Sequence, residues 1–101
     1  MDRQQQVADF LAEYDLEADP AYRILDLVSE VGEVAKDASV STDYGSAPGE
    51  LDVNADEVGD VLFAVLALAD SLDVDAGEAL DEALAKYEER LADTGSAGSG
   101  E

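Results

Sequence analysis

The sequence is 101 residues long, with 26 acidic residues against 5 basic ones and a formal net charge of −21, so it is sized for one domain and lacks the basic surface that direct nucleic-acid binding needs. It contains no cysteine and no histidine, which excludes disulfides, a thiol nucleophile and an imidazole base and leaves carboxylates as the candidate metal ligands. Its longest apolar run, VLFAVLALA at 61–69, is too short to span a bilayer, and the N-terminus lacks a signal-peptide pattern, so we expect a cytoplasmic protein.

The acidic residues are spread along the chain rather than gathered in a tail. In dilute buffer their self-repulsion opposes the compact state, whereas at molar ionic strength the Debye length falls to about 3 Å and the repulsion is screened. The hydrophobic fraction of 47% is ordinary and predicts a folded core. This combination is typical of a cytoplasmic protein from a salt-accumulating halophile; the competing interpretation is an acidic interaction module from an ordinary cell.

Four helices and no strand are predicted, in a single domain over residues 1–93. The apolar residues of segment 2–14 recur at i, i+3, i+4 and i+7, which predicts a first, amphipathic helix. A second helix is predicted over 20–39, with Asp19 as its N-cap and Pro20 at its first position.

Segment 40–53 is rich in Ser, Gly and Pro, which predicts a loop. A third helix is predicted over 55–72, with Asn54 as its cap. The fourth helix opens with DAGE, where Asp75 begins a capping box, and extends to about residue 93. The Gly/Ser-rich segment 94–101 is predicted to be a disordered tail.

The third helix is apolar on all sides from Val61 to Ala69, and such a helix must be covered all round. Three short neighbours in a chain of this length would leave part of it open. We therefore expect a homodimer that pairs these helices across a two-fold axis. The alternative is that the alanine-rich side of the helix lies in water.

Two acidic pairs border the apolar stripes of the second and third helices. Glu30 and Glu33 are three residues apart, as are Glu57 and Asp60, so each pair shares a helix face. In an antiparallel hairpin, at 1.5 Å per residue, Glu33 lies about 9 Å from the end of the second helix, and Glu57 and Asp60 lie about 3 to 8 Å from the start of the third, so the pairs fall at similar levels. Facing carboxylates repel unless cations neutralise them, and an all-oxygen cluster suits Mg²⁺ or Mn²⁺. The competing interpretation is chance spacing of surface acids, with Glu57 completing a capping box begun by Asn54.

The surrounding residues resemble a known family. LDLVSEVGEVAKDA and DEVGDVLFAVLALADSLDVDAGEALDEALAKYEERL resemble the MazG-like nucleotide pyrophosphohydrolases of the all-α NTP pyrophosphatase superfamily, over about residues 20–92. The family signature is ExxE, a spacer and ExxD. Glu30 and Glu33 match its first half, and Glu57 and Asp60 match its second half.

The resemblance implies a four-helix MazG-like bundle completed by homo-oligomerisation, as a dimer or tetramer. It implies Mg²⁺ held by the four matched carboxylates and hydrolysis of a nucleoside triphosphate to the monophosphate and pyrophosphate, with nucleotide-pool house-cleaning as the family-level role. Glu33 or Glu57 could orient the attacking water. The chain departs from the family pattern at Ser29, where many members have a glutamate, and in having no tryptophan for the base.

Two cations of the fourth helix are candidate phosphate ligands. Counted antiparallel from the turn at 73–75, Lys86 and Arg90 lie about 15 and 21 Å along the helix, level with Glu57 and Asp60 at about 22 and 18 Å. They could there hold phosphate oxygens. The competing interpretation of Lys86 is an ordinary surface pair with an acid one turn earlier.

Lys36, one turn beyond Glu33, has a similar but weaker claim to bind phosphate. Asp37 and Asp56 lie near the acidic pairs and are interpreted as solvated acids. Two alternatives to a MazG-like enzyme stay open: a non-enzymatic acidic helical interaction or dimerisation module, and a phosphoribosyl-ATP pyrophosphohydrolase of the same superfamily.

Overall fold

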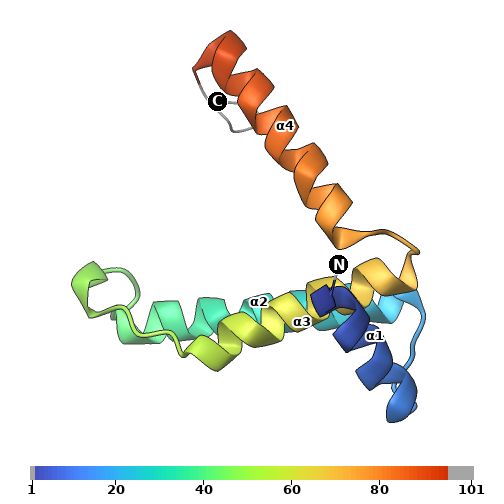
Figure 1. The fold of residues 1–101 in the computed structure, drawn as a ribbon. Coiled ribbons are helices and arrows are strands. Elements are labelled where there is room, and N and C mark those ends of the chain that lie inside the picture. The colour runs from blue at the N-terminus through green and yellow to red at the C-terminus, as the bar shows by residue number, and fades with distance from the viewer. Residues whose placement is uncertain (1, 96–101) are drawn as a thin grey trace.

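The computed structural model describes residues 2–95 and contains four α-helices, one 3₁₀ helix and no strand within that range. The elements are α1 (Asp2–Glu13), α2 (Pro20–Ser41), η1 (Pro48–Glu50), α3 (Ala55–Ser71) and α4 (Ala76–Thr94) (Figure 1). The all-α prediction is confirmed, and the predicted helix ends lie within two residues of the observed ones. None of the helices in this range has the length and apolar composition that crossing a membrane requires.

The three predicted N-caps differ in what their side chains do. Asp75 precedes α4, and its carboxylate accepts a hydrogen bond of 2.9 Å from the backbone N–H of Glu78, as the capping motif predicts. Asp19 and Asn54 precede α2 and α3 with extended backbones, but their side chains make no capping hydrogen bond. Pro20 at the start of α2 has the fixed φ that a first helical turn favours.

The C-terminal end of α4 is formed by Gly95. Its φ of 75° is left-handed, and its N–H donates to the Leu91 carbonyl at 3.0 Å, a helix ending that glycine adopts without steric cost. Thr94, predicted to begin the tail, is still helical. The remainder of that predicted tail, 96–101, lies outside the described residues.

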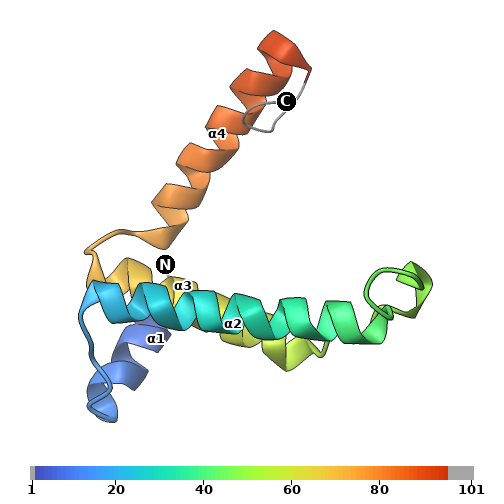
Figure 2. The same ribbon diagram turned by 180° about the vertical axis from the view of Figure 1, so that it is seen from behind.

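Helices α2 and α3 lie side by side and antiparallel, and α1 crosses α3 near the start of α2 (Figures 1 and 2). The buried apolar side chains come mainly from α3, at Ala64, Leu66, Ala67 and Ala69, with Leu11 from α1. Phe10 of α1 packs edge-on against Phe63, with 5.9 Å between the ring centroids. The predicted all-round cover of α3 is incomplete in one chain, because Leu62 and Val65 stay exposed.

Helix α4 projects away from the other three helices, and none of them packs along it within residues 2–95 (Figure 1). The radius of gyration is 16.5 Å, against about 13 Å for a compact domain of this length. The expectation that α4 folds back antiparallel beside α3 is therefore wrong for the single chain. The linker before α4 is held by the Gln4 amide, which donates to the Val74 carbonyl at 2.7 Å and accepts from the Ala76 N–H at 2.7 Å. These bonds fix the point at which α4 departs from the other three helices.

Candidate active site

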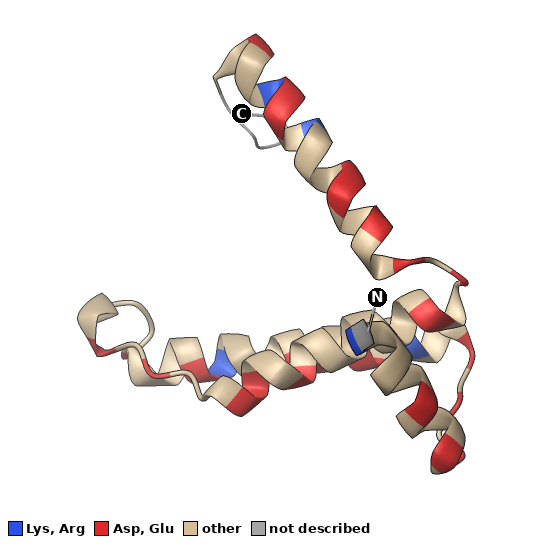
Figure 3. Cartoon of the chain, viewed as in Figure 1, with Lys and Arg blue, Asp and Glu red and all other residues tan. Residues whose placement is uncertain are grey.

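The acidic residues of α2 form one continuous row. Asp26, Glu30, Glu33 and Asp37 follow one another at steps of four, three and four residues, so they share one side of the helix. The α3 acids Asp56, Glu57 and Asp60 lie in the first two turns of the antiparallel neighbour. Figure 3 shows the acidic positions of the two helices along their common length.

Glu30 and Asp60, from different helices, meet at one cavity. It has a volume of about 290 Å³ and is lined by Arg23, Asp26, Glu30, Asp60, Phe63 and Ala64. The Glu30 side chain is half-buried and that of Asp60 exposed. One residue from each predicted acidic pair therefore faces the same space, as the antiparallel hairpin predicts.

The cation at this cavity is already bound within the chain. Arg23 is buried; its guanidinium donates to the Leu16 carbonyl, in the connector after α1, and lies 3.6 Å from the Asp26 carboxylate. Arg23 thus links the α1–α2 connector to the acidic row. Neither Arg23 nor Asp26 was identified as a site residue from the sequence, although the position of Asp26 one turn before Glu30 was a usable signal.

Glu57 forms a second acidic centre, nearer the loop. Its Oε2 atom is buried and has no hydrogen-bond partner among the described residues. The neighbouring Asp37 carboxyl, followed by burial and by the charges of Asp37, Asp56 and Glu33, raises the pKa of Glu57 from 4.5 to about 7. A protonated Glu57 donates a hydrogen bond to Asp37, whereas two ionised carboxylates share no proton and repel. The interpretation of Asp37 as a merely solvated acid was therefore wrong.

The donor chemistry of the two centres suits a hard divalent cation, which binds oxygen ligands. Glu30, Glu33, Glu57 and Asp60 supply only carboxylate oxygens, and the orphaned Glu57 Oε2 lacks a neutralising partner. Over residues 2–95, however, no three His, Cys, Asp or Glu side chains converge into a group that could hold an ion. The structure thus brings the predicted residues into two adjacent centres rather than one tight cluster.

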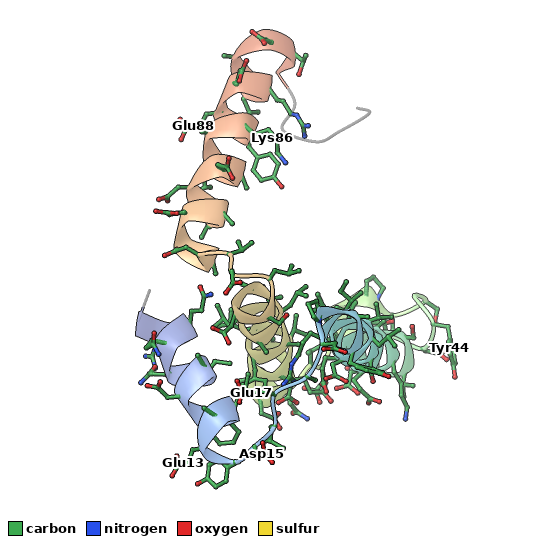
Figure 4. The ribbon with its side chains drawn as sticks, turned by 90° about the vertical axis from the view of Figure 1, so that its right-hand side faces the viewer. Glu13, Asp15, Glu17, Tyr44, Lys86 and Glu88 are labelled. Carbon is green, nitrogen blue, oxygen red and sulfur yellow. The ribbon has the colours of Figure 1, made fainter. Side chains whose placement is uncertain are left out.

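The predicted phosphate ligands lie on two different helices, and those of α4 are separated from these centres. Lys36 is exposed on α2, one turn after Glu33. Lys86 and Arg90 lie on the projecting α4, where the Lys86 ammonium is 5.1 Å from the centroid of the Tyr87 ring, far from the α2–α3 pair (Figure 4). The prediction that these cations lie level with the acidic pairs required α4 to fold back beside α3. Within one chain it is wrong, because α4 projects away.

Comparison with known proteins identifies the family. The model of the MazG nucleotide pyrophosphohydrolase domain matches residues 20–94. YpjD of Bacillus subtilis strain 168, an uncharacterised protein, is 37% identical over 68 residues, which span 63% of this chain and 60% of YpjD; the chain thus covers less than two thirds of that relative. A crystal structure of B. subtilis YpjD, described as a candidate pyrophosphatase, is similar with a TM-score of 0.68 and 32% identity over 85% of this chain and 88% of that one.

Proposed function

The chain belongs to the MazG nucleotide pyrophosphohydrolase domain family, and from that premise we propose that it is a Mg²⁺-dependent nucleoside triphosphate pyrophosphohydrolase. The observation that carries the proposal is the shared cavity of Glu30 and Asp60, which joins the two halves of the acidic pattern across α2 and α3. The substrate is a ribo- or deoxynucleoside triphosphate, cleaved between the α and β phosphates. Removal of non-standard nucleotides, in a salt-rich cytoplasm, is the role we propose for it.

In the proposed reaction a water oxygen bonds to the α-phosphorus and the bond from that phosphorus to the α–β bridging oxygen breaks. The products are the monophosphate and pyrophosphate. Glu30, Glu33, Glu57 and Asp60 would hold Mg²⁺ or Mn²⁺, which supplies neutralisation of the triphosphate charge and a lower pKa of the attacking water when bound.

The other steps belong to the chain itself. Glu57 or Glu33 would orient the water and accept its proton; Glu57 Oε2 accepts no other hydrogen bond among the described residues. Lys36 lies on the same helix as Glu30 and Glu33 and would contact the departing phosphates as a point charge.

We also propose that the chain functions as a homodimer or as a tetramer built from such dimers. The solvent-accessible surface is 7214 Å² for a mass of 10.6 kDa, whereas a compact monomer of this mass exposes about 5,500 Å². Two chains that each lost the excess of about 1,700 Å² would bury an area in the range of obligate homodimers.

The test of the proposed function is pyrophosphate release in molar KCl, with and without Mg²⁺. The panel contains canonical, deoxy and deaminated triphosphates and phosphoribosyl-ATP. We expect Mg²⁺-dependent release that a folded Glu30→Gln/Glu57→Gln variant loses and that Glu13→Gln, an exposed acid on α1 (Figure 4), retains. Release from phosphoribosyl-ATP alone would reassign the substrate, and no release from any nucleotide would leave an acidic interaction module as the better account.

A further inference from the structure

The cavity shared by Glu30 and Asp60 is also lined by two polar residues that the proposed reaction does not use. They are Asp26 and Arg23, which lie about 6 and 10 Å nearer the start of α2 than Glu30, at 1.5 Å per residue. The cavity volume of about 290 Å³ is at the lower end of the range for small-ligand pockets. It has room for one part of a nucleotide rather than for the whole molecule.

The end of the cavity formed by Asp26 and Arg23 suits a neutral group better than an ion. The Asp26 carboxylate lies 3.6 Å from the Arg23 guanidinium, and a fixed cation at that distance repels a metal ion. Asp26 and Glu30 in turn repel a phosphate. A carboxylate and a guanidinium side by side are both satisfied by a planar group that presents N–H donors beside an oxygen acceptor. Among the parts of a nucleotide, the base is the planar one.

Phe63 gives the same cavity an aromatic wall. Its ring lines the cavity and is held by Phe10 of α1, which meets it edge-on with 5.9 Å between the ring centroids. Phe10 is supported in turn by Tyr14, at 4.9 Å between centroids. Aromatic rings stack on any base, because every base has a π-face. The wall therefore favours a base in general, and the choice among bases falls to the polar pair.

The two members of this pair differ in how many hydrogen bonds they can offer a ligand. The Arg23 side chain is 9% exposed, and its guanidinium already donates to the Leu16 carbonyl. The Asp26 side chain is 62% exposed, so both of its carboxylate oxygens can be reached. The pair is thus suited to a base that gives two N–H groups to Asp26 and one acceptor to Arg23.

We propose that Asp26 and Arg23 read the base of the substrate and select guanine. Asp26 accepts the N1–H and the 2-amino N–H of guanine, and Arg23 donates to the 6-carbonyl oxygen. Hypoxanthine lacks the 2-amino group, and adenine presents an acceptor to Asp26 and a donor to Arg23. Cytosine would need two donors from Arg23 and uses one oxygen of Asp26. 8-Oxoguanine keeps the guanine edge, so oxidised guanine nucleotides are included.

The inference rests on the proposed function for the nature of the ligand, and its first test is kinetic. The values of kcat/KM are measured in molar KCl with Mg²⁺ for the triphosphates of guanosine, inosine, adenosine and cytidine, for their deoxy forms and for 8-oxo-dGTP. We expect guanosine to exceed inosine about tenfold or more, since one bond of a bidentate side-chain contact to the base is lost. The same factor should separate dGTP from dITP, and 8-oxo-dGTP should group with dGTP.

Three kinetic outcomes would overturn the inference while leaving the proposed function intact. Equal values for guanosine and inosine triphosphate would show that the 2-amino group is not read. A preference for cytidine would assign the larger share of the contacts to Arg23. A preference for ribose over deoxyribose that is the same for every base would place Asp26 against the sugar.

Asp26→Asn tests the role of Asp26 by a change of preference rather than a loss. The asparagine oxygen still accepts N1–H, but its amide now donates, which suits the 2-carbonyl oxygen of xanthine. We expect the ratio of kcat/KM for xanthosine over guanosine triphosphate to rise about a hundredfold. The thermal unfolding midpoint should change little, because the side chain is exposed. Asp81→Asn, which removes the same charge from an exposed position on α4, should leave the ratio unchanged. An unchanged ratio in Asp26→Asn would overturn the inference.

Binding separates this inference from the proposed function. The α,β-methylene analogues of guanosine and inosine triphosphate resist cleavage between the α and β phosphates, and their Kd values are measured by calorimetry in molar KCl with Mg²⁺. If the wild type hydrolyses nothing, the proposed function fails, and a guanosine analogue bound about tenfold more tightly, with the difference lost in Asp26→Asn, still supports base reading. Equal affinity for the two analogues, or binding of neither, would overturn it.

Discussion

Asp37 of α2 and Glu57 of α3 form a carboxyl pair across the helix interface, and this pair is the largest cause of the raised Glu57 pKa, about 7 instead of 4.5. A carboxyl group whose pKa is higher in the folded chain stabilises the fold below its unfolded pKa and loses that contribution as the pH rises through the folded value. Glu57 thus favours folding at about pH 4.5, and its contribution is lost by about pH 7 and above.

Glu57→Gln should therefore unfold at higher denaturant than the wild type at pH 8 without divalent cations, because the amide removes the repulsion from Asp37. Its stability should also fall less between pH 5 and pH 8. Activity should drop about a hundredfold or more if Glu57 moves the proton of the water. Urea titrations at both pH values, with Glu50→Gln as an exposed control, measure this; equal pH dependence of variant and wild type would contradict it.

Leu62→Glu should convert the proposed dimer to monomer, because Leu62 lies on the part of α3 that one chain leaves uncovered and is 53% exposed. Burying a leucine stabilises by about 1.5–3 kcal/mol, and a two-fold interface buries it twice, so the dimer Kd should rise about a hundredfold or more. Sedimentation equilibrium in molar KCl measures the Kd. Val40→Glu, also exposed but on the other side of α2, should leave it unchanged; a monomeric wild type would contradict the dimer itself.

The sequence predicted the helices and the antiparallel meeting of the acidic pairs, because both follow from spacing along single helices. It did not predict that Asp37 rather than Glu33 is the main neighbour of Glu57. The apolar residues of α2 cover more of its surface than α3 contacts, so several rotations of α2 about its axis would each place apolar residues against α3. Packing in the folded chain, and not the sequence pattern, selects one of them. Only that rotation determines which acids meet.

The direction of α4 was missed for a different reason. Its cap and its stripe are local, so Asp75 and the helix were predicted correctly. The exit of α4 depends on Gln4, whose side chain bonds to Val74 and Ala76 some seventy residues later. No periodicity in the sequence reports a single side-chain contact of that range.

Arg23→Met should destabilise the fold, because Arg23 is buried and its guanidinium satisfies the Leu16 carbonyl. Leaving such a group without its partner costs about 1–3 kcal/mol. The measurement is the free energy of unfolding in urea and molar KCl. Arg3→Gln removes an equal charge from an exposed position and should change this free energy little; an effect as large as that of Arg23→Met would assign the loss to net charge alone.

Asp75→Ala should loosen the first turn of α4. The N–H of Glu78 lowers the pKa of Asp75 below its ordinary 3.8, so the capping contribution is complete well above that value and is lost as the pH falls through the lowered pKa. Amide hydrogen exchange at pH 7 should be faster at Glu78 in the alanine variant. Asp75→Asn keeps a capping oxygen, so it should retain protection of the Glu78 amide, and that protection should not depend on acidification. Unchanged exchange in Asp75→Ala would show that the Asp75 cap does not stabilise the first turn of α4.

Stability should increase steeply with salt. With 26 acidic and 5 basic residues, folding brings like charges together, and raising KCl from 0.1 to 2 M shortens the Debye length from about 10 Å to below about 3 Å. The thermal unfolding midpoint, followed by circular dichroism, should rise throughout that range. Sucrose favours the compact state without screening charge, so it serves as a control for stabilisation by solute exclusion alone.

A second control changes the charge itself. Glu13→Lys brings the net charge to −19, since one acid is lost from −21 and one base is gained, and it should lower the KCl concentration needed for a given midpoint. A midpoint that rose equally in sucrose and was insensitive to Glu13→Lys would show that self-repulsion does not limit this fold.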